Sequence, residues 1–241
     1  RAPIKSWPAK IPPAWRLAML PRQARANESP LSKPPKTPRL SARPASGNSP
    51  QSSLRIIGGS WRGRKLAFPC IEGLRPTSDR IRETLFNWLM ADIHQARCLD
   101  VCAGSGALGF EAISRGAQLA VLLDTHPEVV QQLTRNCQSL QTDKVRVHRQ
   151  DALSFLKAGC SEPFNLIFLD PPFAANLWQP LAEALQQGGW LAPEALIYVE
   201  APLNQTLNLP ASLQLIKDKK AGQVAYRLYR HQPDATHITP P

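Results

Sequence analysis

Residues 97–109 read RCLDVCAGSGALG, a short strand at 97–101 that leads through a glycine-rich turn into a helix around 108–115. Gly104, Gly106 and Gly109 match the spacing G-x-G-x-x-G. Glycine at these positions permits a tight turn and lets a ligand approach the backbone closely. Dinucleotide-binding enzymes carry the same spacing, so the loop alone does not identify the ligand.

Downstream of this loop, predicted strands alternate with predicted helices. The strands cover 119–123, 145–147, 164–169 and 195–200, and the helices cover 127–140, 152–157 and 177–187. Two last strands, 213–217 and 223–229, flank the turn Lys219-Lys220-Ala221-Gly222. Strands that alternate with helices form a mostly parallel sheet covered on both faces. We therefore predict an α/β, Rossmann-like fold with a seven-stranded sheet, in which a closing hairpin adds antiparallel pairing.

Upstream of the loop, residues 54–90 predict a small hairpin followed by a helix. The segments LRIIGG at 54–59 and WRGRKL at 61–66 are typical of two strands joined by a Gly-Gly turn. The run PTSD at 76–79 then opens a helix, with Thr77 or Ser78 as its cap and apolar residues at helical spacing behind it.

The first 53 residues differ in amino-acid composition from the rest. They hold eleven of the 24 prolines and ten Lys or Arg against a single acid, Glu28. Such a segment buries too little apolar surface to offset its chain entropy, so we expect 1–53 to be a disordered basic tail, and 233–241 a disordered C-terminal tail. The domain proper is expected over 54–232, with the hairpin and helix at 54–90 and the Rossmann-like core at 91–232.

The net charge of +11 is concentrated in the N-terminal third, because residues 83–241 hold twelve basic and fifteen acidic residues. A basic end on a near-neutral body is typical of proteins that bind a polyanion. No window reaches the apolar length of a membrane span. The five cysteines lack paired spacing and His94, His126 and His148 are isolated, so we expect reduced, buried thiols, no metal site and a cytoplasmic protein.

Three carboxylates favour one class of ligand over another. Asp100 precedes the glycine loop, where it would repel a pyrophosphate but can pair with a cationic amino-acid group. Asp124 ends the second strand and can hold ribose hydroxyls, and Asp151 follows the third strand, where it can accept from an adenine amine. A sulfonium nucleoside with an ammonium group suits this set better than a dinucleotide does. The alternative for Asp124 and Asp151 is a turn or helix-cap role.

The most informative motif is Asp170-Pro171-Pro172-Phe173, directly after the apolar strand 164–169. Ligands of open α/β sheets bind outside the carboxyl ends of the strands, which is where this tetrapeptide falls. Two prolines hold the loop extended and stiff. The Asp170 carboxylate and the Pro171 carbonyl can then each accept one N–H of a single NH2 group, while Phe173 offers a face on which a flat base can stack.

An aromatic exocyclic amine is a poor nucleophile because its lone pair is delocalised into the ring. Two fixed acceptors turn that lone pair toward an electrophilic methyl group and stabilise the charge that grows on nitrogen. The motif therefore predicts methyl transfer to the amine of a nucleobase; the alternative is a plain strand-ending Pro-Pro turn.

These motifs, together with LRIIGGSWRGRKL, GLRPTSDRIRETLFNWL and AGQVAYRLY, resemble the bacterial RsmD-type family of 16S rRNA guanine-N2 methyltransferases over about 54–230. The resemblance implies a class I fold that takes S-adenosylmethionine as cofactor and one guanine of 16S rRNA, in the small ribosomal subunit or its assembly intermediate, as substrate. We expect the enzyme to act as a monomer.

The resemblance also implies roles for individual residues. The target amine would be held by four consecutive residues, Asp170, Pro171, Pro172 and Phe173. The cofactor would be surrounded by Asp100, Ala103, Gly104, Ser105, Gly106, Asp124, Asp151 and Ala152.

Basic and aromatic residues near the hairpin and helix are the predicted RNA contacts: Arg55, Trp61, Arg62, Arg64, Lys65, Arg75, Arg80 and Arg82. The helix carrying Arg80 and Arg82 is alternatively a lid over the cofactor or a solvated docking helix, and Trp61 is equally well a core residue.

Three other functions remain open from the residues. An adenine-N6 methyltransferase would use the same tetrapeptide, although the chain lacks the target-recognition domain expected of one that acts on DNA. The glycine spacing alone also fits an NAD-linked oxidoreductase, which the Asp-Pro-Pro-Phe motif disfavours. A non-catalytic ribosome-assembly factor could keep the same fold.

Overall fold

The computed structural model describes residues 51–232. The predicted C-terminal tail and nearly all of the predicted N-terminal tail therefore lie outside the described residues. Strand β1 begins at Gln51, so residues 51–53, which the sequence assigned to the tail, belong to a strand.

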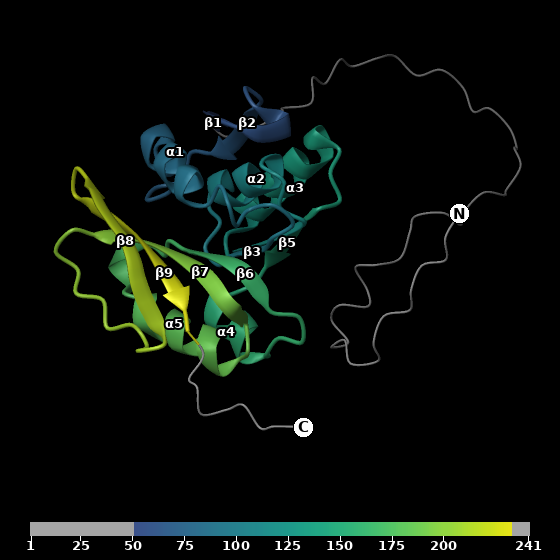
Figure 1. The fold of residues 1–241 in the computed structure, drawn as a ribbon. Helices are drawn as coiled ribbons and strands as arrows, with labels where there is room; N and C mark the ends of the chain where they lie inside the picture. The colour runs from purple at the N-terminus through teal and green to yellow at the C-terminus, as the bar shows by residue number, and fades with distance from the viewer. Residues whose placement is uncertain (1–50, 233–241) are drawn as a thin grey trace, which may run out of the picture. The chain divides into compact units, whose positions relative to one another are not determined.

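The main sheet has seven strands in the order β5-β4-β3-β6-β7-β9-β8 (Figure 1). The first five of these pair in parallel, and β9 runs antiparallel to both β7 and β8. The predicted Rossmann-like fold with its closing hairpin is confirmed. The strands are β3 (Arg97–Asp100), β4 (Leu119–Asp124), β5 (Val145–Arg149), β6 (Phe164–Leu169), β7 (Leu191–Pro202), β8 (Leu213–Ala221) and β9 (Val224–His231).

The hairpin of β8 and β9 is longer than predicted. Pairing continues to Ala221 opposite Val224, so Lys219 and Lys220 lie in β8 and the turn is shortened to Gly222 and Gln223. Gly222 has φ +59°, a left-handed conformation that glycine adopts without cost. The charged residues that suggested a loop therefore belong to an exposed edge strand, where lysine is common.

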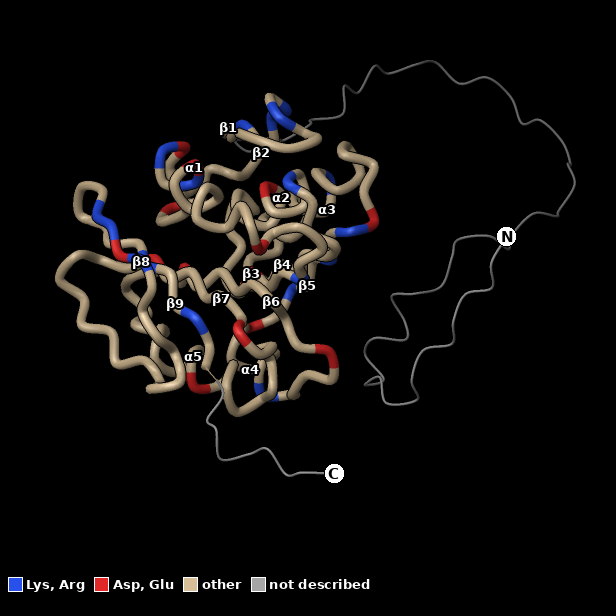
Figure 2. The backbone as a smooth tube through the Cα atoms, viewed as in Figure 1, with Lys and Arg blue, Asp and Glu red and all other residues tan. Residues whose placement is uncertain are grey.

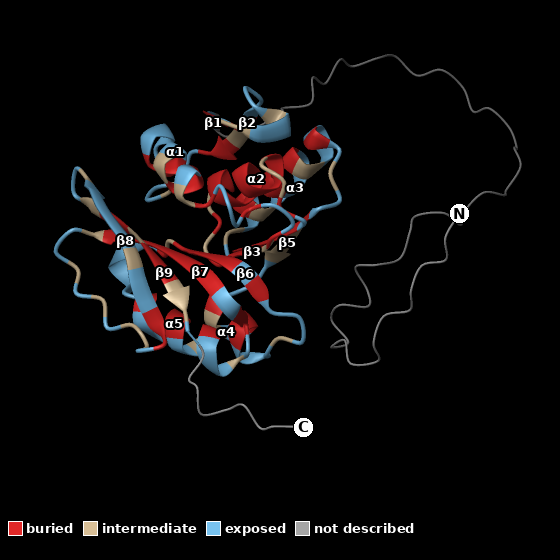
Figure 3. Cartoon of the chain, in the orientation of Figure 1, coloured by how far each residue is buried: buried red, intermediate tan, exposed pale blue. Residues whose placement is uncertain are grey.

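Helices cover both faces of the sheet. Figure 1 shows α1, α2 and α3 on one side and α4 and α5 on the other. Apolar residues of β4 and β6 are buried in near-continuous runs, as expected of parallel strands between two helical layers. Figure 3 shows buried positions, in red, along the middle of the sheet at β6 and β7. The helices are α1 (Asp79–Trp88), α2 (Ala107–Ser114), α3 (Pro127–Leu140), α4 (Ala152–Lys157) and α5 (Trp178–Gln187).

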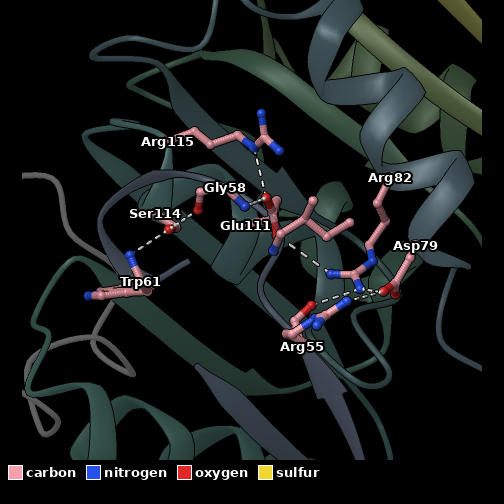
Figure 4. A network of polar contacts seen from close by, with 9 residues as sticks. Arg55, Gly58, Trp61, Asp79, Arg82, Glu111, Ser114 and Arg115 are labelled. Carbon is pink, nitrogen blue, oxygen red and sulfur yellow. Dashed lines mark hydrogen bonds and ion pairs between the residues drawn. The ribbon is translucent and has the colours of Figure 1, made fainter. Parts of the chain in front are cut away.

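The N-terminal hairpin exists, but its strands are displaced from the prediction. They are β1 (Gln51–Arg55) and β2 (Lys65–Pro69), and a 3-10 turn at Gly59–Trp61 lies in the connection between them. The ladder stops because the Glu111 carboxylate of α2 accepts the backbone N–H groups of Ile57 and Gly58, each at 2.8 Å (Figure 4). A tertiary contact thus replaces the predicted Gly-Gly turn.

Two smaller expectations have definite outcomes. Ser78, not Thr77, caps α1, because its hydroxyl accepts from the Ile81 N–H. All five cysteines are free, but only Cys98 is fully buried and Cys70 is exposed, so the expectation of uniformly buried thiols was wrong. Between residues 51 and 232, the helices are all too short or too polar to cross a membrane.

Candidate active site

Five acidic residues stand at the carboxyl ends of five neighbouring parallel strands. Read across the sheet from β5 through β4, β3 and β6 to β7, they are Asp151, Asp124, Asp100, Asp170 and Glu200. Burial and then the charges of the four aspartates raise the pKa of the Cys102 thiol. The thiol is therefore close enough to each of the four carboxylates to be affected by its charge. The row places the predicted carboxylates in one site, as the switch-point rule for open sheets requires.

The glycine loop between β3 and α2 lies at the centre of this row. Gly104 and Gly106 have φ of +49° and +74°, left-handed values that favour glycine. A Cβ on Gly106 would come within 2.6 Å of Leu133, so this glycine serves packing as well. A Cβ on Gly104 would meet only Leu74 Cγ at 3.8 Å, which leaves open space beside the backbone at the point where a ligand would approach.

Asp100 connects the two ends of the loop. Its side chain is buried and accepts the backbone N–H groups of Cys102 and Gly109. Burial, reinforced by the charge of Asp124, raises the pKa of Asp100 to about 7 in spite of these hydrogen bonds. This bridging contact was not predicted from the sequence, which indicated only that the carboxylate lies near the ligand.

Asp124 and Asp151 also hold the local backbone. Asp124 accepts the N–H of Gly104 at 3.0 Å through Oδ2 and the N–H of His126 at 2.8 Å through Oδ1. Asp151 caps α4 by accepting the Ser154 N–H at 2.8 Å. The turn and cap roles considered as alternatives are therefore present. A carboxylate accepts about four hydrogen bonds, so both side chains retain capacity for a ligand.

The Asp170-Pro171-Pro172-Phe173 loop leaves β6 beside this row. Pro171 is buried, whereas the Phe173 ring is 41% exposed at the start of the 3-10 turn Phe173–Ala175. The Phe173 ring lies 6.0 Å from the ring of Trp178 on α5. The motif thus presents an accessible aromatic face next to a partly buried acid, Asp170.

Glu200 of β7 was missed by the sequence analysis. Its carboxylate accepts the Tyr198 hydroxyl at 2.8 Å and also a hydrogen bond from the side chain of Thr77. Burial raises the pKa of Glu200 and, together with the charge of Glu200, raises the pKa of Asp170 well above its ordinary value. Only register across β6 and β7 brings these acids together, so no local motif marks Glu200.

Most predicted RNA-contacting residues are exposed around the hairpin and the start of α1. A cleft of about 330 Å³ lies between these elements, with Arg55 and Lys65 among its lining residues. The exposed set is Arg55, Arg62, Arg64, Lys65, Arg75 and Arg80. Trp61 is half-buried and packs against the core, which agrees with the alternative of a core residue as well as with partial access.

Arg82 was wrongly predicted as an RNA contact. Its side chain is 1% exposed and its guanidinium lies 2.6 Å from Asp79 and 3.5 Å from Glu111 (Figure 4). Arg82 and Phe86 lie on the buried side of α1, and Glu111 offers the Arg82 guanidinium a buried counter-charge there. Figure 2 shows basic positions that the prediction omitted, along β8, where Lys217, Lys219 and Lys220 are exposed.

The donor set of the site fits S-adenosylmethionine. Three carboxylates at β3, β4 and β5 match the ammonium, ribose and adenine groups of that molecule, and the space beside Gly104 leaves room for it. The Asp100 carboxylate stands beside the glycine loop, where it would repel the pyrophosphate of a dinucleotide but can pair with the ammonium group of S-adenosylmethionine. The fold and site define a Rossmann-like methyltransferase that uses S-adenosylmethionine.

Comparison with known proteins identifies the family to which the chain belongs. It belongs to the family described as conserved hypothetical protein 95, which matches residues 54–230. It is 50% identical over 186 residues to the ribosomal RNA small subunit methyltransferase D of Escherichia coli K12, covering 77% of this chain and 93% of that protein. The Haemophilus influenzae protein of that name is 48% identical, with 75% and 95% covered.

The similarity to a solved structure agrees with this family. The putative methyltransferase yhhF from Escherichia coli superposes with a TM-score of 0.70 at 48% identity, covering 75% of this chain and 99% of that one. The resemblance to the RsmD-type family that the sequence motifs suggested is confirmed.

Proposed function

We propose that the protein transfers a methyl group from S-adenosylmethionine to the exocyclic N2 of one guanine in 16S rRNA, within the small ribosomal subunit or its assembly intermediate. The observation that carries the proposal is the Asp170-Pro171-Pro172-Phe173 loop at the carboxyl end of β6, next to the glycine loop of β3. The relatives named ribosomal RNA small subunit methyltransferase D support the substrate class.

The loop positions the amine in this reaction. The Asp170 carboxylate and the Pro171 carbonyl each accept one N2–H, which directs the nitrogen lone pair toward the donor, and Pro172 keeps the loop extended. S-adenosylmethionine supplies the electrophilic methyl group, which moves from sulfur to N2 and leaves a neutral thioether. Asp170 then takes the proton that N2 must lose, because burial and Glu200 raise the pKa of its carboxyl.

The cofactor is held along the same sheet edge. Loop residues Ala103, Gly104, Ser105 and Gly106 enclose its methionine part, with Asp100 as the nearby negative charge. Asp124 holds the ribose hydroxyls, and Asp151 with Ala152 lies at the adenine. Because Asp100, Asp124 and Asp151 also hold backbone groups, the site is ordered in part before the cofactor binds.

The exposed basic residues of the hairpin and of the start of α1 bind RNA phosphates, so the domain at 54–232 carries both binding and chemistry. Phosphate contacts position a nucleic acid without reading its sequence. The target guanine must leave its stack to reach Phe173, at a cost of a few kcal/mol. We further propose that the protein acts as a monomer in the cytoplasm.

Methyl transfer from tritiated S-adenosylmethionine to small subunits that lack the modification tests this function, with nucleoside analysis of the product. We expect labelled N2-methylguanosine, and no label with Asp170→Ala. The matched control is Asp143→Ala, an exposed acid away from the sheet edge. Labelled N6-methyladenosine would change the substrate to adenine. An inert protein that still bound subunits tightly would indicate an assembly factor, and nicotinamide binding without S-adenosylmethionine binding would overturn the proposal.

A further inference from the structure

Glu200 stands next to the target-amine loop without a role in the reaction as proposed. In the parallel pair β6 and β7, Leu169 lies opposite Val199. The next residue of each strand, Asp170 and Glu200, therefore lies side by side and on the same face of the sheet. The charge of Glu200 acts on Asp170 more strongly than the charge of any other group, which agrees with this placement.

The side chains that donate hydrogen bonds to Glu200 are neutral. Its carboxylate accepts from the hydroxyl of Tyr198 and from the side chain of Thr77, and all three residues are less than a tenth exposed. Within residues 51–232, neither Glu200 nor Asp170 forms an ion pair. Two adjacent carboxyl groups without a cation, one buried (Glu200) and one partly buried (Asp170), are costly to the fold, and such arrangements concentrate at functional sites.

Glu200 is also fixed relative to the aromatic face of the site. Its backbone carbonyl accepts the indole N–H of Trp178 at 2.8 Å, and the Trp178 ring lies 6.0 Å from the Phe173 ring. A base stacked on Phe173 with its amine at Asp170 would therefore turn the same edge toward Glu200. The carboxylate has hydrogen-bond capacity left beyond its two hydroxyl donors.

The edge of the base decides what such a second acceptor can do. Guanine carries N1–H directly beside its N2 amine, so this edge offers contiguous donors. Adenine carries an unprotonated N1 beside its N6 amine, so a carboxylate there would face a lone pair. A buried acceptor that meets an acceptor loses its hydrogen bond and discriminates strongly against that ligand.

We propose that Glu200 is a specificity-determining residue that accepts the N1–H of the target guanine, while Asp170 and Pro171 hold the N2 amine. The inference rests on the proposed function, because it takes guanine N2 as the methyl acceptor. A hydrogen bond from guanine N1–H to Glu200 explains why this site would favour guanine, although the Asp-Pro-Pro-Phe loop can present the amine of either purine. The group that would repel the N1 lone pair of adenine is the carboxylate of Glu200, which follows Val199 in β7.

The test compares guanosine with 2-aminopurine riboside at the mapped target position of 16S rRNA assembled into small subunits. 2-Aminopurine keeps the N2 amine but has an unprotonated N1. We expect wild-type protein to methylate it with a kcat/KM at least ten-fold below that for guanosine. Glu200→Gln places an N–H donor opposite N1, and should reduce this preference at least ten-fold. Glu194→Gln, an exposed carboxylate on the same strand, is the matched control.

Each outcome has a definite meaning. Equal rates on the two bases with wild-type protein would overturn the role of Glu200, whether or not the variant folds. A folded Glu200→Gln protein that slows both bases equally would also overturn it, because a purely structural role, or recognition of guanine through O6, leaves the ratio unchanged. Absence of methyl transfer to guanosine by wild-type protein would overturn the proposed function itself, which separates the two failures.

Discussion

The guanidinium of Arg82 lies 3.5 Å from the carboxylate of Glu111, and both side chains are almost completely buried. Glu111 also accepts the Arg115 Nε–H at 2.7 Å and the backbone N–H groups of Ile57 and Gly58. One acid of α2 therefore holds two arginines and the N-terminal hairpin together (Figure 4). Through this contact the basic hairpin has a fixed position on the methyltransferase core.

Glu111→Ala should destabilise the protein by roughly 3–5 kcal/mol, because it leaves the buried Arg82 without its inner partner and two backbone donors unpaired. The free energy of unfolding in urea measures the effect. Glu83→Ala, on the exposed side of α1, is the control and should stay within about 0.5 kcal/mol of wild type. A decrease below about 1 kcal/mol for Glu111→Ala would show that the network contributes little.

Replacing Arg62 and Lys65 with Gln should weaken RNA binding without slowing the reaction at saturating RNA. Both side chains are exposed at the hairpin, so the substitutions remove charges that bind phosphates and leave the core intact. The slope of log K against log salt should fall by roughly one for each phosphate that is no longer neutralised. Filter binding from low to high salt measures the slope, and Lys157→Gln on α4 is the control. An unchanged slope would place the RNA on another surface, with exposed β8 as the first to examine.

How far the sequence predicts this site depends on the range of the interactions. The glycine loop and the Asp-Pro-Pro-Phe motif are local, so their place after β3 and β6 follows from the strand pattern alone. Glu200 depends on strand register, and Arg82 on a counter-charge about 30 residues away, so neither could be assigned from spacing. The hairpin strands were displaced for the same reason, because Glu111 takes backbone donors that a local pattern assigns to a ladder.

Asp100→Asn should change how the stability of the ligand-free protein depends on pH. Burial raises the pKa of Asp100 from 3.8 to about 7, so the folded protein retains a proton that the unfolded chain releases. This contribution favours the fold below pH 4 and is lost as the pH rises toward 7. The Tm of the variant minus that of wild type should therefore increase by on the order of 5 °C between pH 4.5 and 7.5.

Thermal melting across that pH range measures the Asp100 effect, with Asp143→Asn as an exposed control. The two backbone hydrogen bonds favour the ionised carboxylate, and the pKa of about 7 already includes their effect, so the expected direction of the change with pH stays the same. A difference in Tm that stays constant with pH would mean that Asp100 titrates normally in the folded protein.

Phe173→Ala should lower kcat/KM for RNA by roughly ten- to hundred-fold, because stacking of one base on an aromatic ring contributes about 1–3 kcal/mol. The ring is 41% exposed, so its removal should change the free energy of unfolding far less than removal of a core aromatic would. Phe173→Tyr keeps the aromatic face and should retain most activity. Binding of S-adenosylmethionine alone should be the same in all three proteins, which separates removal of the base platform from damage to the cofactor site. Equal kcat/KM for Phe173→Ala and wild type would mean that the base stacks elsewhere, and the neighbouring Trp178 is too deeply buried to replace the ring.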